Sequence, residues 1–232
     1  MSLKAAKRKM STKNYMAVLS MFYILSVTLH ATKTTAFHVE SSQEASSAEQ
    51  LRLGVYYETL CPDSRSFMRN SLYDGMILNE WLKYTELELI PYGKVTSWTD
   101  PDTNITTLFC QHGRTECELN ALHACIVEHH DVRDQLKLIS CLLSGHTTTL
   151  DECAKDLVLD VSAVKECKAA RSIPDILKKY GEKTDALDIS FVPSVTFDGK
   201  FDRWRQRYFI YNFSVVFCRE YKAKFNVTLP QC

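Results

Sequence analysis

Residues 51–64, LRLGVYYETLCPDS, decide the fold. The first eight residues alternate in character and are rich in β-branched and aromatic side chains, which predicts a strand. The strand runs into the turn CPDS at residues 61–64, and a helical pattern follows, with apolar residues at three- and four-residue spacing: Phe67, Met68, Leu72, Met76 and Ile77. Residues 86–92, ELELIPY, alternate again as a second strand. This order predicts a βαβ unit with parallel strands and a right-handed crossover.

Residues 94–185 interrupt this order with a cysteine-rich stretch. Helical periodicity is clear in residues 116–130 and 132–143 and moderate in 161–180, which predicts a helical insertion stapled by disulfides. Beyond it, FVPSVTFDGKF holds two short apolar runs joined by Asp198-Gly199, a strong signal for a hairpin. Residues 210–221 are expected to form a closing helix. The predicted fold class is α/β with a disulfide-rich helical insertion.

Composition excludes several classes of function. The chain has 232 residues, of which 45% are hydrophobic and 24% charged, so it fits one domain with an insertion or at most two small ones. The 28 basic residues balance the 28 acidic ones, and without a basic excess a nucleic-acid partner is not expected. The sequence contains no G-x-S-x-G, H-E-x-x-H or phosphate-loop pattern, so a hydrolase or kinase is unsupported.

The amino-terminal 36 residues are predicted to be a signal peptide. A basic stretch up to Lys13 precedes an apolar run at residues 15–29, and small residues follow up to Ala36. The apolar run is shorter than the roughly 20 residues that span a bilayer, although a retained signal anchor is the alternative. Removing residues 1–36 takes away six basic and no acidic residues, which leaves a net charge of about −6.

The rest of the chain is consistent with export. Residues 37–50 are polar and serine-rich, so we expect a flexible lead-in to a domain over residues 51–232 with no membrane span. Three sequons predict glycosylation at Asn104, Asn212 and Asn226, provided that Asn212 is not buried. Nine cysteines suit an oxidising compartment. We expect a secreted protein, with the lysosome as the alternative location.

Cys61 is the candidate nucleophile. It lies at the start of the first helix, where free amide hydrogens and the helix dipole favour the thiolate, assisted by Arg65 and opposed by Asp63. In a Cys-x-x-Cys enzyme the second cysteine resolves the mixed disulfide, but Ser64 occupies that position here. A serine hydroxyl can donate a hydrogen bond to the thiolate but cannot form the internal disulfide.

Cysteine parity leaves Cys61 as the odd thiol. The other eight cysteines suffice for four disulfides, with 105 possible connectivities, so the pairing stays open. These disulfide candidates are Cys110, Cys117, Cys125, Cys141, Cys153, Cys167, Cys218 and Cys232. The alternatives for Cys61 are a buried leftover thiol or a bond to another chain.

Pro193 is the second candidate site residue. It precedes a late strand, which is where thioredoxin-like proteins hold a cis proline beside the reactive cysteine. The alternative is an ordinary strand-opening proline, since cis bonds are uncommon overall.

Metal ligation and acid–base chemistry are weaker interpretations. Residues 110–125 are dense in cysteine and histidine, but the short paired spacings of zinc sites are absent, and disulfides are favoured. No metal or other cofactor is therefore expected. His129 and His130 beside Asp131 indicate acid–base work only weakly, because such residues more often cap or solvate a helix end.

The cysteine-rich stretch resembles a known family. The signature C-Q-H-G-x-x-E-C-x-x-N-x-x-x-x-C of gamma-interferon-inducible lysosomal thiol reductases is matched in full, by Cys110, Gln111, His112, Gly113, Glu116, Cys117, Asn120 and Cys125. Further similarities are YYE at residues 56–58, LIPYG at 89–93, TDAL at 184–187, Val192-Pro193 and the tail cysteines. The resemblance covers roughly residues 51–232.

The resemblance implies a thioredoxin-like fold and an ancestral role in reducing protein disulfides, often at acidic pH in lysosomes. Cys61 resembles the nucleophilic cysteine of the family, and Ser64 stands where the family has its resolving cysteine. Two hypotheses follow. Either Cys61 supports monothiol exchange with protein disulfide substrates, while dithiol reductase activity is impaired or lost, or the chain is a non-catalytic secreted protein that binds another protein or a cell surface.

Overall fold

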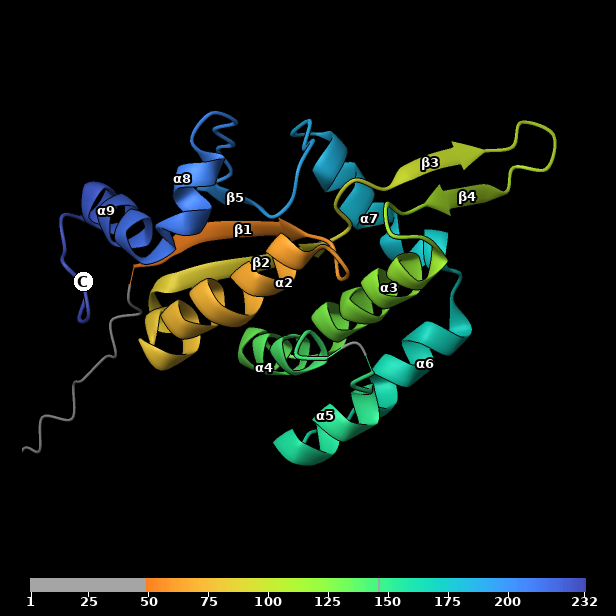
Figure 1. The fold of residues 1–232 in the computed structure, drawn as a ribbon, viewed down its shortest axis with the longest axis horizontal. Helices are drawn as coiled ribbons and strands as arrows, with labels where there is room; N and C mark the ends of the chain where they lie inside the picture. The colour runs from red at the N-terminus through yellow and green to blue at the C-terminus, as the bar shows by residue number, and fades with distance from the viewer. Residues whose placement is uncertain (1–48, 146) are drawn as a thin grey trace, which may run out of the picture. The chain divides into compact units, whose positions relative to one another are not determined.

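The computed structural model describes residues 49–145 and 147–232. A three-stranded sheet lies at its centre, with β1 (Leu51–Tyr57) between β2 (Thr85–Pro91) and β5 (Ser194–Phe197) (Figure 1). β1 runs parallel to β2 and antiparallel to β5, and Val55 lies opposite both Leu89 and Val195. The two predicted strands and their parallel pairing are confirmed. The predicted signal peptide and residues 37–48 of the lead-in lie outside the described residues.

The crossover between β1 and β2 is helical but not uniformly α-helical. It begins as α2 (Pro62–Phe67) and continues through π-helical turns at Met68–Leu72 and Asp74–Leu78 and a 3₁₀ turn at Trp81–Tyr84. Of the five apolar residues that predicted this helix, four are buried and Ile77 is half-buried. The apolar stripe therefore faces the core, as the spacing indicated.

The region between β2 and β5 contains a two-stranded ribbon and five helices. The ribbon pairs β3 (Thr96–Thr99) with β4 (Thr106–Phe109). The helices are α3 (Arg114–His129), α4 (Val132–Leu142), α5 (Leu150–Leu157), α6 (Ser162–Ala170) and α7 (Ile173–Asp185). The ribbon was not predicted, because all four β3 residues are exposed and carry no buried alternation to detect.

The periodic stretch 161–180 forms two helices rather than one. α6 ends at Ala170, and α7 begins after Ser172, whose hydroxyl accepts a hydrogen bond from the Asp175 amide at 3.3 Å. Pro174 occupies the first turn of α7, where its missing N–H costs nothing. A new amino-terminal cap at this point restarts the helix.

Four disulfides join the eight candidate cysteines. They pair Cys110 with Cys117, Cys125 with Cys167, Cys141 with Cys153, and Cys218 with Cys232. Three of the four therefore lie in the region that was expected to be stapled: one closes the loop before α3, one joins α3 to α6, and one joins α4 to α5.

The hairpin predicted at residues 191–201 is only a turn, which corrects that expectation. Asp198 and Gly199 adopt φ of 50° and 75°, but a single bridge between Phe197 and Lys200 follows, and no second strand forms. The side chain of Gln206 occupies the place of that strand. Its Oε1 accepts a hydrogen bond from the Val195 amide at 2.7 Å, and its Nε2 donates to the Val195 carbonyl at 2.8 Å.

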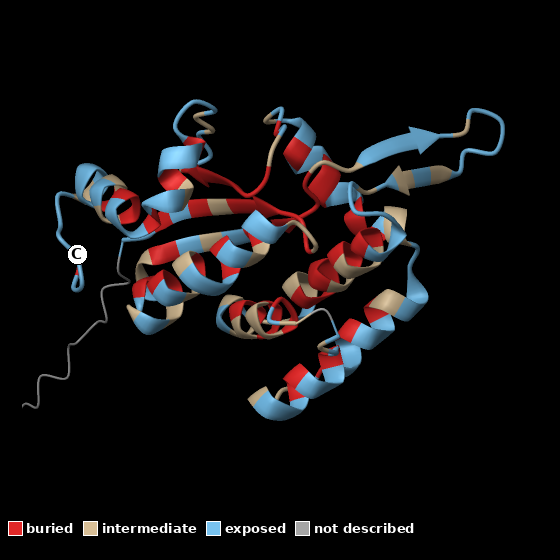
Figure 2. Ribbon diagram, viewed as in Figure 1, coloured by how far each residue is buried: buried red, intermediate tan, exposed pale blue. Residues whose placement is uncertain are grey.

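The closing helix is divided in two. α8 (Gln206–Tyr211) and α9 (Phe213–Phe225) meet at Asn212, where the single predicted helix 210–221 is interrupted. α9 carries aromatic residues into the core: Phe217 stacks on Trp81 at 5.0 Å, and Phe213 meets Phe67 edge-on at 5.3 Å. Figure 2 shows the buried positions along β1, β5 and the inner helix faces. No described helix is long and apolar enough to cross a membrane.

Candidate active site around Cys61

Cys61 is the residue at which β1 and its turn give way to α2. It caps the helix with φ −64° and ψ 121°, and its carbonyl accepts from the Arg65 amide at 3.0 Å. Its thiol is half-buried and is not part of any disulfide. The Arg65 guanidinium, which was expected to assist this thiol, donates to the Leu143 carbonyl at 2.7 Å. Asp63 lies exposed at the start of α2.

Pro193 lies beside Cys61, because β5 pairs with β1. The Val192-Pro193 bond is cis, and the Cys61 Sγ is 3.8 Å from the Val192 carbonyl oxygen, to which it donates. Register places Tyr56 opposite Ser194, so the end of β1 meets the start of β5. The two candidate site residues, 132 positions apart in sequence, are thus brought together by strand pairing.

Ser64 is fully buried, one helical turn after Cys61. Its hydroxyl oxygen accepts a hydrogen bond from the Glu58 amide at 3.4 Å. The serine therefore ties the start of α2 back to the turn that follows β1. A hydroxyl in this position satisfies a buried backbone donor but supplies no second thiol.

Two signature residues on α3 hold the segment just before Cys61. Asn120 Oδ1 accepts from the amide and the hydroxyl of Thr59 at 3.0 and 2.8 Å, while its Nδ2 donates to the Tyr92 carbonyl at 3.3 Å. Glu116 Oε2 accepts from the Leu60 amide at 3.3 Å. Glu116 and Asn120 are four residues apart, so both side chains leave the same face of the helix.

His112 joins Glu58 and Glu116 in a polar cluster beneath this segment. The His112 Nδ1 is 2.6 Å from Glu116 Oε2 and 3.8 Å from Glu58 Oε2. The Lys94 amide donates to Glu58 Oε1 at 2.6 Å. Burial raises the pKa of Glu58, the Lys94 amide opposes that rise, and the charge of Glu116 adds to it. Both glutamates are fully buried.

The remaining signature residues shape the loop before α3. The Cys110–Cys117 disulfide closes this loop, and Gly113 adopts φ of 81°, a conformation that favours glycine. Gln111 is exposed. Sequence reasoning missed Glu58 and Thr59 as partners of the signature; the YYE similarity pointed to the segment but not to its contacts.

The other histidines differ in environment. His123 is buried, with its Nδ1 3.1 Å from the Tyr57 hydroxyl, and burial lowers its pKa to about 3, with the Arg65 charge acting in the same direction. His129 and His130 lie at the carboxyl end of α3. Asp131 caps α4 by accepting from the Arg133 and Asp134 amides. This trio therefore marks helix ends, which was the favoured interpretation.

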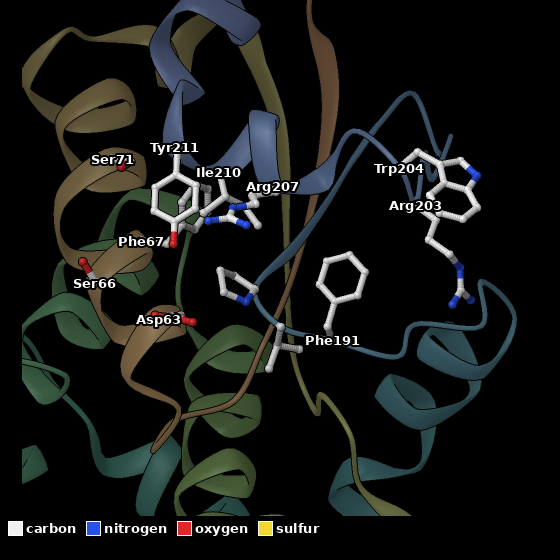
Figure 3. Close-up of a pocket in the computed structure, with 12 residues that line it drawn as sticks. Asp63, Ser66, Phe67, Ser71, Phe191, Arg203, Trp204, Arg207, Ile210 and Tyr211 are labelled. Carbon is white, nitrogen blue, oxygen red and sulfur yellow. The ribbon is translucent and has the colours of Figure 1, made fainter.

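A groove with a volume of about 420 Å³ opens next to the cis proline (Figure 3). In the view, Asp63 and Ser66 of α2 form one side, Arg207 and Tyr211 of α8 another, and Phe191 a third. Its lining residues are Asp63, Ser66, Phe67, Ser71, Phe191, Val192, Pro193, Arg203, Trp204, Arg207, Ile210 and Tyr211. Trp204 and Tyr211 are 91% and 72% exposed, which leaves large aromatic surfaces uncovered at the groove.

The three sequon asparagines are all exposed. Asn104 lies in the loop between β3 and β4, Asn212 between α8 and α9, and Asn226 at the end of α9. Asn212 is therefore not buried, which was the condition for its predicted glycosylation.

A parallel β1–helix–β2 unit, a free cysteine where its helix begins and a cis proline before an antiparallel strand define a thioredoxin-like protein. The family model for gamma interferon inducible lysosomal thiol reductase (GILT) matches residues 52–157. GILT-like protein 2 of Drosophila melanogaster is 41% identical over 185 residues, which cover 80% of this chain and 87% of that protein. The chain belongs to the GILT family.

Two further proteins are similar to this chain over most of its length. The gamma-interferon-inducible lysosomal thiol reductase-like protein of Anopheles gambiae is 30% identical over 185 residues, covering 71% of this chain and 74% of that protein. Among solved structures, oxidised BdbD of Bacillus subtilis aligns with a TM-score of 0.49 and 12% identity, over 74% of this chain and 88% of that one.

Proposed function

We propose that this GILT-family protein exchanges disulfides through the single thiol of Cys61 and that its dithiol reductase activity is lost or strongly impaired. The observation that carries the proposal is Ser64. It occupies the resolving position, fully buried and bonded to the Glu58 amide, one turn after the free cysteine. The nucleophile is retained, whereas the group that would release a mixed disulfide from within the chain is absent.

The exchange reaction requires an external thiol to release the mixed disulfide from Cys61. The Cys61 thiolate attacks one sulfur of a substrate disulfide, forms a mixed disulfide and expels the other sulfur as a thiolate. A low-molecular-weight thiol then attacks the mixed disulfide, regenerates Cys61 and leaves as a disulfide with the substrate sulfur. Electrons pass from the external thiol to the substrate, and the protein itself is not consumed.

The groove beside Pro193 supports a protein or peptide substrate. It is lined by Asp63, two residues after Cys61, and by Pro193, and it combines aromatic surface with charged and hydroxyl groups, a mixture that suits an extended peptide. Protein disulfides are therefore the proposed substrates.

We propose that the protein acts in the secretory pathway or outside the cell, with the lysosome as the alternative. Four disulfides fit an oxidising compartment, and the exposed sequons at Asn104, Asn212 and Asn226 are accessible to glycosylation. The signal-like pattern at residues 1–36 fits this route.

The test compares four proteins in a disulfide-reduction assay with an external thiol. The parent should give slow turnover and accumulate a mixed disulfide at Cys61, and Cys61→Ser should give neither. Ser64→Cys should increase turnover by at least about tenfold, because a resolving thiol replaces an intermolecular step by an intramolecular one. Asn70→Cys is the matched control, since it adds an exposed thiol to the same helical crossover outside the groove. Exchange that persists in Cys61→Ser would refute the proposal.

The second candidate is a non-catalytic binding protein. The observation that favours it is the exposure of Trp204 and Tyr211 at the groove, since aromatic side chains dominate protein interfaces. On this hypothesis, binding to an extracellular protein or cell surface survives Cys61→Ser and is lost in Trp204→Ala. Thiol-dependent capture that disappears in Cys61→Ser would instead support the exchange function.

A further inference from the structure

The polar cluster beneath the Cys61 segment has the composition of a metal site. Three segments contribute to it: Glu58 follows β1, His112 precedes α3, and Glu116 lies in the first turn of α3. One oxygen or nitrogen from each residue lies within 4.8 Å of the others. Both carboxylates are fully buried, while the His112 side chain is 34% exposed and opens the cluster to solvent.

An unpartnered oxygen points into this cluster. Glu58 Oε2 is buried and has no hydrogen-bond partner among the residues that the structure describes, whereas Oε1 of the same carboxylate is held by the Lys94 amide. Buried carboxylate oxygens are almost always paired, so an orphan calls for an unseen donor or cation. The imidazole of His112 faces this oxygen, with its Nδ1 3.8 Å from Glu58 Oε2.

The cradle around Glu58 is closely fitted. Gly93 has φ of 68°, and a Cβ on it would lie 2.2 Å from Glu58 Cγ. The backbone at residues 93 and 94 thus encloses the side chain and fixes one of its oxygens. A carboxylate whose second oxygen is anchored by a backbone amide is oriented in the way that outer-shell contacts orient metal ligands.

We infer that Glu58, His112 and Glu116 bind one zinc ion. Zinc bonds to nitrogen and oxygen at about 2.0–2.2 Å, which sets tetrahedral ligand atoms about 3.3 Å apart. The distances from His112 Nδ1 to the two carboxylate oxygens, 3.8 and 2.6 Å, bracket that value. A small rotation of the imidazole away from Glu116 would make these two distances equal. His112 would then bind zinc through Nδ1 and carry its proton on Nε2. Water would take the fourth position.

Charge favours a cation at this place. Two buried carboxylates that share a site repel each other, and the charge of Glu116 raises the pKa of Glu58, while Lys94 and His112 act in the opposite direction. Zinc would offset both charges and would clamp the turn after β1 to α3 through Glu58 and Glu116. Because Glu116 also accepts from the Leu60 amide, the ion would stiffen the segment that leads to Cys61.

A second cluster of metal-ligand types serves as an internal comparison. Glu128, His129 and Cys167 also lie close together, but the sulfur of Cys167 is bonded to Cys125. Glu128 is moreover paired with Arg171 and Lys179, at 2.6 and 3.1 Å. The disulfide removes Cys167 as a thiolate ligand, and the two cations already balance the charge of Glu128.

The experiment titrates the metal-stripped, disulfide-intact protein with zinc chloride by calorimetry. We expect one zinc per chain, at least about tenfold weaker binding in His112→Asn and in Glu58→Gln, and unchanged binding in the matched control His129→Asn. Circular dichroism verifies that each variant is folded. The measurement needs no disulfide exchange, so it is independent of the proposed function.

Cobalt(II) gives a second measurement on the parent protein alone. A nitrogen and oxygen ligand set predicts visible d–d absorption without the intense sulfur-to-cobalt band that a Cys61 ligand would produce. Absence of saturable binding, binding unchanged in His112→Asn, or a strong sulfur band would each overturn the inference.

Discussion

The buried His123 predicts a loss of stability in acid. Its pKa is about 3 in the fold, against 6.5 for an ordinary histidine, because burial disfavours the imidazolium. Above about pH 6.5 the side chain is neutral in both the folded and the unfolded chain, so it contributes no pH dependence. Below that pH His123 is protonated in the unfolded chain, whereas in the folded chain it stays neutral down to about pH 3. The free energy of unfolding therefore falls as pH falls through this window.

The magnitude follows from the width of the window. Each pH unit between the two pKa values removes about 1.4 kcal/mol, so lowering the pH from about 6.5 to about 4.5 removes about 3 kcal/mol. His123→Gln abolishes this titration while keeping a side chain that can hydrogen-bond to Tyr57. Its free energy of unfolding should depend less steeply on pH than that of the parent.

The assay is urea unfolding followed by tryptophan fluorescence, because Trp81 is fully buried. Carboxylates titrate in both proteins, so the difference between parent and variant isolates the histidine. His129→Gln is the control, since it replaces a histidine that is exposed rather than buried. Parallel curves for the parent and His123→Gln from about pH 7.5 to about pH 4.5 would refute the reasoning. An NMR titration in which the His123 ring protons shift near pH 6.5 would do so independently.

Two further predictions concern the segment that leads to Cys61. Asn120→Ala leaves the buried Thr59 amide without its acceptor, so urea unfolding should show a loss of about 1–3 kcal/mol, and alkylation of Cys61 should change in rate. Gly93→Ala should destabilise the fold much more than Gly199→Ala in the same assay. Both glycines have positive φ, but a Cβ at Gly93 meets Glu58, whereas one at Gly199 meets nothing within 4 Å. Equal losses of unfolding free energy in the two variants would mean that Glu58 can move to accommodate a Cβ at residue 93, which would contradict this prediction.

Local sequence patterns predicted the central strands and their crossover, and they also singled out Cys61 and Pro193. Alternation over residues 51–58 and 86–92 and the apolar stripe from Phe67 to Ile77 are short-range signals, and they correctly indicated β1, β2 and the crossover between them. Pro193 could be placed because thioredoxin-like proteins hold a cis proline before a late strand, and the Val192-Pro193 bond is cis. Cysteine parity left Cys61 as the unpaired thiol, in agreement with the four disulfides.

The contacts between distant segments could not be predicted in this way. Glu58 and Glu116 are 58 positions apart, and their meeting depends on how α3 packs against the end of β2. The hairpin failed for a related reason. Asp198-Gly199 specifies a turn, but a strand also needs a partner with free backbone groups, and the Val195 groups are already taken by Gln206.

Gln206 therefore covers part of one edge of the sheet with a single side-chain amide, next to the turn in which Lys200 pairs with Phe197. β5 is one of the two edges of the sheet, and an open edge is a template on which another chain can add a strand. By presenting one acceptor and one donor to Val195, the side chain imitates a one-residue strand that cannot propagate further. An apolar residue of similar size in its place would preserve the packing but leave those backbone groups available to a neighbouring molecule.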